Sequence, residues 1–320
     1  AIGYDALKVF TTGYNNTIMG YRAGYSTTTG FTNVYLGYQA GYRNTTGRAN
    51  IAIGSNSQQG VSGQTTGQYN VSIGEQSLLG LTSGNHNFAV GSNAGLSLTT
   101  GEHNVIMGAS AGDALTTTSS TIIIGREAGS AINSTGANGT VLIGAYAGTA
   151  LTSGANNTAV GLSALQSLTS GYNNTALGHQ AGASISSTTS TDNTIIGDRA
   201  GTGGSGVMTY CTAIGSGALN GTGTRNSNMN TAIGMNSMGG SFGGTVNFNT
   251  AVGGNTMTGA LNAAYYNVAV GYTTLQNLTT GDNNVALGFQ AGYSLTSGGS
   301  NVIIGHEAYR LGTSSTIVAI

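Results

Sequence analysis

Hydrophobic positions recur along this chain with a basic period of 17 residues, lengthened in places to as many as 20. Each repeat has a glycine, called here the anchor glycine, that directly follows Ile, Leu, Val or Met. Thr, Val, Ile or Phe stands two residues before this aliphatic residue, usually with a small residue between the two. This alternation predicts a short strand, and we expect its two larger side chains to point inward and the middle one outward. The 18 anchor glycines are Gly3, Gly20, Gly37, Gly54, Gly74, Gly91, Gly108, Gly125, Gly144, Gly161, Gly178, Gly197, Gly215, Gly234, Gly253, Gly271, Gly288 and Gly305.

The segment after each anchor glycine is also regular. A small residue stands three positions on, as at Ala23, Ser57 and Ala94, and its constancy indicates that two backbones approach closely there. Many repeats continue with Leu-Thr-Thr-Gly or Leu-Thr-Ser-Gly, as in residues 98–101. We expect this second glycine to adopt a positive φ in a turn.

An asparagine stands four positions before the anchor glycine in 14 of 17 repeats, and the exceptions are Thr121, Thr140 and Cys211. We predict that each side-chain amide bonds to the amide or backbone of the next coil, which satisfies turn groups that the strands cannot reach. The members of this predicted ladder are Asn16, Asn33, Asn50, Asn70, Asn87, Asn104, Asn157, Asn174, Asn193, Asn230, Asn249, Asn267, Asn284 and Asn301.

The repeat predicts an all-β fold, a parallel β-solenoid or β-roll of about 18 coils with a 17–20-residue repeat. It covers residues 1–320, so we expect a single repeat domain. A helical fold is not favoured, because Thr, Gly and Asn are weak helix formers. Coils stacked at about 4.8 Å would make a rod of roughly 80 Å.

Composition agrees with this fold and narrows the function. The chain has 56 Gly, no Pro and 5% charged residues. Pro would remove N–H donors that a stack of strands needs, and stacked like charges would repel each other. The net charge of −1 gives no electrostatic basis for nucleic-acid binding, and no apolar run is long enough for membrane insertion.

The middle strand position is often apolar, as at Ala52, Ile106 and Ile123. A strand face in water would alternate with polar residues. Because we place this position on the outer face, we predict that another copy of the chain covers that face. The sequence therefore predicts a homo-oligomer.

Two kinds of repeat segment carry a resemblance to known families. Residues 157–161 and 174–178, which read Asn-Thr-Ala-Val-Gly and Asn-Thr-Ala-Leu-Gly, resemble the Asn-Ser-Val-Ala-Ile-Gly head repeats of trimeric autotransporter adhesins. Residues 36–42 and 287–293 resemble bacteriophage tail-fibre repeats of the type Asn-Thr-Ala-Ile-Gly-Tyr-Gln-Ala-Gly. The resemblance covers the whole chain and implies a left-handed, trimeric β-roll, although the period of 17 is longer than that of the adhesin heads.

The sequence contains short motifs that are known from catalytic and ligand-binding sites, but the elements that normally accompany these motifs are not expected here. Residues 201–206 match GxGxxG and residues 108–112 match GxSxG, but neither is followed by an expected helix. His86 and His103 are one period apart, yet no carboxylate or Cys completes a metal site with them. We therefore predict no catalytic residues, no cofactor and no metal, and we expect that the chain is not an enzyme.

Two regions are candidate contact surfaces. Residues 179–271 hold five long repeats, and insertions in a solenoid often mark its binding face. This region carries Gly-, Met- and Tyr-rich loops, which include Met229, Met235, Met238, Met257, Tyr265 and Tyr266. Both ends present strand edges, and the end-to-end contact candidates are Ala1, Ile2, Gly3, Val318, Ala319 and Ile320.

The predicted function is structural. We expect a subunit or segment of an extracellular fibre or filament, on a cell surface, in a secreted filament or in a virion fibre, that assembles with itself as a homotrimer or filament. The alternative is an adhesin or phage-fibre module that recognises a cell-surface glycan or receptor, for which exposed tyrosines such as Tyr21 and Tyr38 are suited. Ice binding is less favoured, because the adjacent Thr pairs would point to opposite faces of a strand.

Overall fold

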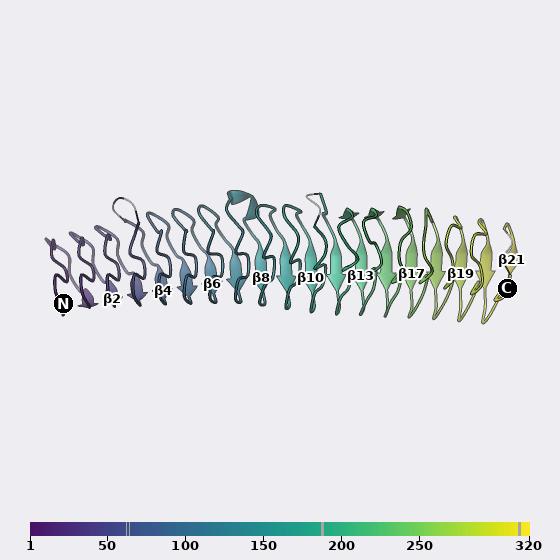
Figure 1. The fold of residues 1–320 in the computed structure, drawn as a ribbon, viewed down its shortest axis with the longest axis horizontal. Helices are drawn as coiled ribbons and strands as arrows, with labels where there is room; N and C mark the ends of the chain where they lie inside the picture. The colour runs from purple at the N-terminus through teal and green to yellow at the C-terminus, as the bar shows by residue number, and fades with distance from the viewer. Residues whose placement is uncertain (62, 64, 187–188, 313–314) are drawn as a thin grey trace. The chain divides into compact units, whose positions relative to one another are not determined.

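The computed structural model describes residues 1–61, 63, 65–186, 189–312 and 315–320. The chain divides into two compact units, Ala1–Asn157 (unit 1) and Thr158–Ile320 (unit 2). In each unit, one turn of the chain carries one short strand of a main sheet, and these strands pair in parallel with those of the adjacent coils (Figure 1). The predicted fold class is confirmed, because the chain is an all-β parallel β-solenoid of about 17–18 coils. The prediction of a single domain stays a prediction.

The described residues of unit 1 form eight main-sheet strands and one short helical turn. Each strand has three residues and ends directly before an anchor glycine. The 3₁₀ turn η1 (Thr135–Ala137) lies in the long loop that precedes the last strand. The strands are β1 (Thr17–Met19), β2 (Val34–Leu36), β3 (Ile51–Ile53), β4 (Val71–Ile73), β5 (Phe88–Val90), β6 (Val105–Met107), β7 (Ile122–Ile124) and β8 (Val141–Ile143).

Unit 2 repeats this arrangement and adds a second, narrow sheet. Its main-sheet strands are β9 (Thr158–Val160), β10 (Thr175–Leu177), β11 (Thr194–Ile196), β13 (Thr212–Ile214), β15 (Thr231–Ile233), β17 (Thr250–Val252), β18 (Val268–Val270), β19 (Val285–Leu287), β20 (Val302–Ile304) and β21 (Val318–Ala319). Three long coils also carry β12 (Met208–Thr209), β14 (Ser227–Asn228) and β16 (Val246–Asn247), which form a separate sheet in the order β12–β14–β16. Isolated bridges join Thr209 of β12 to Thr191 and Asn247 of β16 to Tyr265.

Insertions do not disturb the register of the main sheet. Thr17 pairs with Val34 across a 17-residue step, and Ile51 pairs with Val71 across a 20-residue step. The extra residues are absorbed in the loop between strands. Equivalent residues of adjacent coils therefore lie directly above one another, which makes every repeat position a column along the unit.

The orientation predicted for the strands is wrong. The middle residue of each three-residue strand is buried, and the first and third residues are partly or fully exposed. The interior is filled by this middle residue, by the small residue three positions after the glycine and by the Leu of the Leu-Thr-Thr-Gly segment, as at Ala89, Ala94 and Leu98. The middle position is most often alanine, and the interior also holds larger side chains there, such as Ile106, Ile123 and Leu142.

The two glycine columns have different causes. The anchor Gly108 has φ +133°, a conformation that L-residues rarely adopt, and a Cβ there would lie 2.6 Å from the carbonyl carbon of Gly125. The predicted positive φ at Gly101 is wrong, because this residue is absent from the positive-φ positions of the chain. Gly101 is needed for space instead, since a Cβ would lie 2.1 Å from the carbonyl oxygen of Thr118.

Tyr35 departs from the small middle residues and is fully buried inside unit 1. Two glycines make room for its ring, because a Cβ at Gly41 would lie 2.7 Å from ring carbon Cδ2, and one at Gly24 would lie 3.0 Å from it. The side-chain amide of Asn44 donates a hydrogen bond to the Tyr35 hydroxyl. Burial raises the pKa of Tyr35 well above its ordinary value.

Tyr35→Phe is expected to lower the free energy of unfolding by about 1–3 kcal/mol, because the buried amide of Asn44 loses its acceptor. Chemical denaturation of both proteins measures this loss. The pKa shift adds a pH signature. Both states hold a neutral phenol below pH 10, but above it the unfolded state ionises and the folded state does not, so wild-type stability falls. If Tyr35→Phe shows the same loss of stability above that pH, the assignment of this effect to Tyr35 is wrong.

Candidate functional site

The recurring asparagines form hydrogen-bonded columns inside each unit, and Thr121, Thr140 and Cys211 replace asparagine at three positions. Asn87 donates through Nδ2 to the carbonyl oxygen of Gly101 at 2.9 Å and to Oδ1 of Asn70 at 3.1 Å. Its Oδ1 accepts from the backbone N–H of Asn104 at 3.2 Å and from Nδ2 of Asn104 at 2.9 Å. The side chain is buried. Each asparagine of this type therefore joins its own coil to both neighbours and pairs turn groups that no strand reaches.

The residues that replace asparagine in this column keep part of its bonding. The Thr121 hydroxyl donates to Oδ1 of Asn104 at 2.8 Å. The backbone N–H of Cys211 donates to Oδ1 of Asn193 at 2.9 Å, and its thiol contacts the carbonyl oxygen of Ser227 at 3.1 Å. Burial raises the pKa of the Cys211 thiol, so this residue is a packed member of the column and a poor nucleophile.

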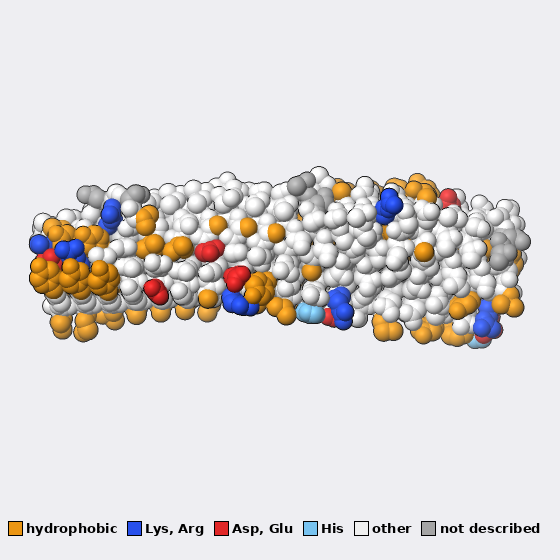
Figure 2. Space-filling view, viewed as in Figure 1, with side chains coloured by type: hydrophobic (Ala, Val, Ile, Leu, Met, Phe, Trp, Pro, Cys, Tyr) orange, Lys and Arg blue, Asp and Glu red, His pale blue; other side chains and the backbone are white. Residues whose placement is uncertain are grey.

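The outer strand face, formed by the first and third residues of the main-sheet strands, is apolar and accessible. Phe88 is 38% exposed in unit 1, and Leu177 and Leu287 are each 47% exposed in unit 2. No main-sheet strand carries a charged residue within the described part of the chain. Figure 2 shows exposed hydrophobic side chains on the surface of each unit. Parallel sheets are ordinarily covered on both faces, so this surface is unusual for an isolated chain.

From the sequence we predicted that the middle strand residue forms the outer face, whereas the first and third residues form it in the structure. The prediction that the outer surface is apolar does not depend on this choice. Both sets of strand positions are largely apolar. The signal that could have distinguished them is the frequency of alanine, which recurs at the middle position and at neither of its neighbours, although Ile and Leu also occur at the middle position.

The titratable side chains are scattered over the surface. His86 and His103 stack with ring centroids 5.0 Å apart, and Tyr69 stacks on His86 at 4.9 Å. His179 Nδ1 lies 2.7 Å from Oδ1 of Asp198, and hydrogen bonds from His179 and Arg199 hold the pKa of this carboxyl below its ordinary value. Among the described residues, no three His, Cys, Asp or Glu side chains form a group that could hold a metal ion.

The GxSxG and GxGxxG motifs both lie in turns. Residues 108–112 follow β6 in a turn, and residues 201–206 form turns before β12. No helix follows either motif within the described residues, so the geometry of a nucleophile elbow or a dinucleotide-binding turn is absent there. That the chain is not an enzyme stays a prediction.

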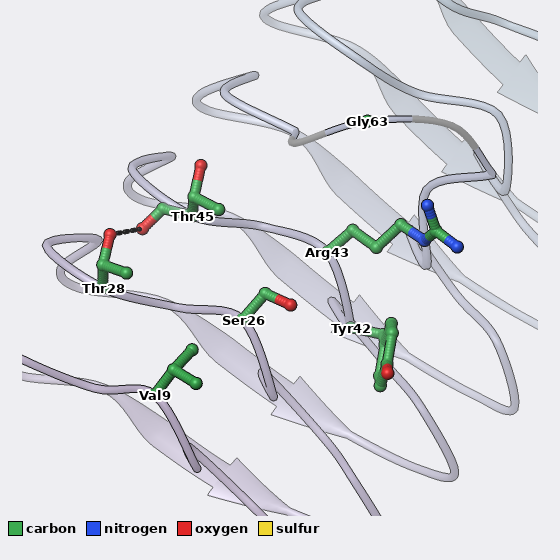
Figure 3. A pocket seen from close by; sticks show the side chains of 7 residues that line it. All are labelled: Val9, Ser26, Thr28, Tyr42, Arg43, Thr45 and Gly63. Atoms are coloured by element: carbon green, nitrogen blue, oxygen red, sulfur yellow. Dashed lines mark hydrogen bonds between the residues drawn. The ribbon is translucent and has the colours of Figure 1, made fainter.

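A polar surface pocket of about 450 Å³ lies among the first coils of unit 1 (Figure 3). The hydroxyls of Thr28 and Thr45 are engaged, since each donates to a carbonyl oxygen of the following coil, at 3.2 and 3.3 Å. The guanidinium of Arg43 points away from these threonines in Figure 3. The pocket therefore brings together no acid–base pair, and its one charged side chain stands apart from its hydroxyls.

The predicted contact residues fall into separate environments. In the long coils of unit 2, Met238 and Met257 are buried in the core, whereas Met229, Met235 and Tyr266 are exposed. The end-to-end contact candidates lie at the first and last strands of the chain, and their contact stays a prediction. The exposed candidates among them include Ile2, Val318 and Ile320.

A shallow apolar groove of about 390 Å³ lies beside the narrow sheet of β12, β14 and β16 in unit 2. Sequence reasoning pointed to these coils by their length but missed the residues that form the floor of the groove, Thr209, Asn228 and Asn247. They could not be singled out, because Asn and Thr occur throughout the chain and a pairing of short second strands has no periodic signal of its own.

No protein-family model matches this chain, and no curated protein matches it in sequence. Within the described residues, no helix is long and apolar enough to cross a membrane.

Proposed function

We propose that this chain is a structural subunit or segment of an extracellular fibre or filament that assembles with itself through its outer strand face. The observation that carries the proposal is that this face consists of Val, Ile, Leu, Met, Phe and Thr side chains, without a charged residue on the described strands. Water contact with such a surface is unfavourable, and a copy of the same surface is a complementary cover.

The backbone geometry supports a mechanical role. Neighbouring coils are joined by strand ladders, by the asparagine columns and by hydroxyl-to-carbonyl bonds such as Thr99 Oγ1 to Thr116 at 2.9 Å. A chain in which nearly every turn is bonded to the next one resists local unfolding and proteolysis. Location outside the cell, and a trimer as the first unit of assembly, follow from the resemblance to adhesin and tail-fibre repeats.

The double variant Val105→Lys with Met107→Lys tests this assembly. Both residues lie on the outer strand face of β6 with their side chains directed outward. We expect the wild-type chain to sediment as an oligomer and the variant to sediment as a monomer at the same micromolar concentration, because burying two lysines in an apolar contact is costly.

Thr100→Lys is the matched control, since Thr100 is exposed on a loop of the preceding coil, away from the strands. It should leave the sedimenting mass unchanged. A wild-type chain that is monomeric, or a strand variant that assembles as well as the control, would show that the outer strand face is not the assembly surface. The wild-type mass also tells a trimer from other assemblies.

A further inference from the structure

The groove of unit 2 beside β12, β14 and β16, called here the flank groove, is uncharged. Eight residues line it, and none of them is acidic or basic. Apart from Thr189, its lining comes from three successive coils, and each of these coils contributes one polar residue of the paired strands and the large side chain that follows it. The residues used below are Thr209, Tyr210, Asn228, Met229, Asn247 and Phe248.

The floor of the flank groove carries polar groups with spare hydrogen-bonding capacity. Thr209, Asn228 and Asn247 pair in register and are half-buried. Oδ1 of Asn247 accepts from the backbone N–H of Asn228 at 2.9 Å. Within the described part of the chain, the Asn247 Nδ2, the Asn228 carboxamide and the Thr209 hydroxyl make no hydrogen bond. These donors and acceptors are therefore available to a ligand.

The wall of the flank groove is a row of large side chains held in fixed directions. Tyr210, Met229 and Phe248 each follow a floor residue and have left-handed backbones, with φ of 55°, 53° and 60°. They are 57%, 49% and 41% exposed. Phe248 stacks on Tyr266 at 5.0 Å, whereas Tyr210 makes no ring contact with any described residue. An open tyrosine ring thus stands beside unpaired amide and hydroxyl groups.

We propose that the flank groove binds a linear, neutral oligosaccharide. A sugar ring offers C–H groups that pack on an aromatic wall and hydroxyls that pair with amides and hydroxyls on the floor. A polymer of sugar rings repeats its groups along its length, as the groove repeats its own once per coil. The absence of charge from the lining disfavours nucleic acids and acidic polysaccharides. The proposal uses no residue of the outer strand face and does not depend on assembly.

The test is binding of the full chain to an array of linear hexasaccharides. The neutral members are the β-1,4 and α-1,4 glucose oligomers and the oligomers of N-acetylglucosamine and mannose, and the acidic members are oligogalacturonate and hyaluronan. We expect a neutral member to bind and the acidic ones not to bind. Titration calorimetry should then show that Tyr210→Ala weakens the affinity about tenfold or more, and that Asn228→Leu also weakens it.

Two controls keep the result specific. Alanine occupies the repeat position of Tyr210 at Ala49, with a left-handed φ of 51° against 55° at Tyr210, so Tyr210→Ala is compatible with the fold. Tyr172→Ala removes a tyrosine of unit 2 that is 50% exposed outside the groove, and it should leave the affinity unchanged.

Three outcomes would overturn the proposal. The first is an array without a neutral binder, and the second is a neutral binder whose affinity is equally reduced by Tyr172→Ala or unaffected by Tyr210→Ala. The third is a Tyr210→Ala variant that changes the sedimenting mass and leaves saccharide binding intact, which would make the groove a contact between copies. Failure of the Val105→Lys and Met107→Lys test would leave this proposal untouched.

Discussion

Gly108→Ala is expected to lower the free energy of unfolding by about 2–6 kcal/mol, one of the largest effects of any single methyl group in this chain. Two costs add together. The residue has φ +133°, which strains any L-residue, and the new Cβ would lie 2.6 Å from the backbone of Gly125 in the next coil. Relief requires the two coils to separate, which breaks the bonds of the β6–β7 ladder. Chemical denaturation gives the size of the loss.

Gly305→Ala separates the two costs. Gly305 has a similar φ of +130°, but the nearest heavy atom to its Cβ would be 3.6 Å away, in ordinary contact. We expect this variant to lose only the strain, about 1–3 kcal/mol. Equal losses at the two glycines would mean that the close contact between coils contributes nothing and that the backbone angle alone selects glycine.

Asn284→Leu is expected to cost about 3 kcal/mol or more, since several buried groups lose partners together. Nδ2 of Asn284 donates to the carbonyl oxygen of Gly298 at 3.0 Å and to Oδ1 of Asn267 at 2.9 Å. Its Oδ1 accepts from Nδ2 of Asn301 at 2.7 Å. Leucine fills nearly the same space and excludes water, so the orphaned carbonyl and amide stay unpaired. Thermal and chemical unfolding of the full chain measure the loss.

Asn283→Leu is the matched control, because it makes the same chemical change one residue earlier. Asn283 is exposed, has a left-handed φ of 58°, and its side chain forms no hydrogen bond with the described residues. We expect a loss of about 1 kcal/mol from the backbone preference alone. A similar loss at both positions would show that the asparagine column is a matter of local conformation and not of bonding between coils.

The strand residues face the opposite way from the prediction, and this changes how much apolar area is available for assembly. Had the middle residues faced outward, the outer surface would be mostly alanine, with little area to bury. The structure instead places Val, Ile, Leu, Met and Phe there, as at Phe88 and Leu177, and these side chains bury more area in a contact. The proposed self-association therefore has a stronger physical basis in the structure than in the sequence.

Periodicity was enough to determine the fold class. The anchor glycine and the strand before it recur through the chain, and a coil of 17 residues has room for one strand and its turns. The asparagines were recognisable for the same reason, because a polar residue that returns once per coil lies above its own copy. The hydrogen bonds between Asn87 and Asn104 depend only on that stacking.

Other features of the structure could not be predicted from the repeat pattern. Asn228 and Asn247 form the groove floor because a second set of short strands pairs in three long coils. The 17-residue period contains no signal for this second pairing. Tyr35 interrupts the column of small residues, and its place inside depends on glycines at positions 24 and 41 and on Asn44. Each of these is a contact between residues of different coils, so local pattern carries little information about it.

The sequence by itself determined the coil length, the parallel stacking and the columns of glycine and asparagine, because these follow from repetition alone. Only the tertiary structure decided which strand face is inside. The alternation of side-chain directions along a strand puts Phe88 and Val90 on one face of the strand and Ala89 on the other. It does not determine which of these two faces packs against the core. That choice is made by packing across the coil, where Ala89 is buried together with Ala94 and Leu98 while the larger Phe88 and Val90 lie on the outer face.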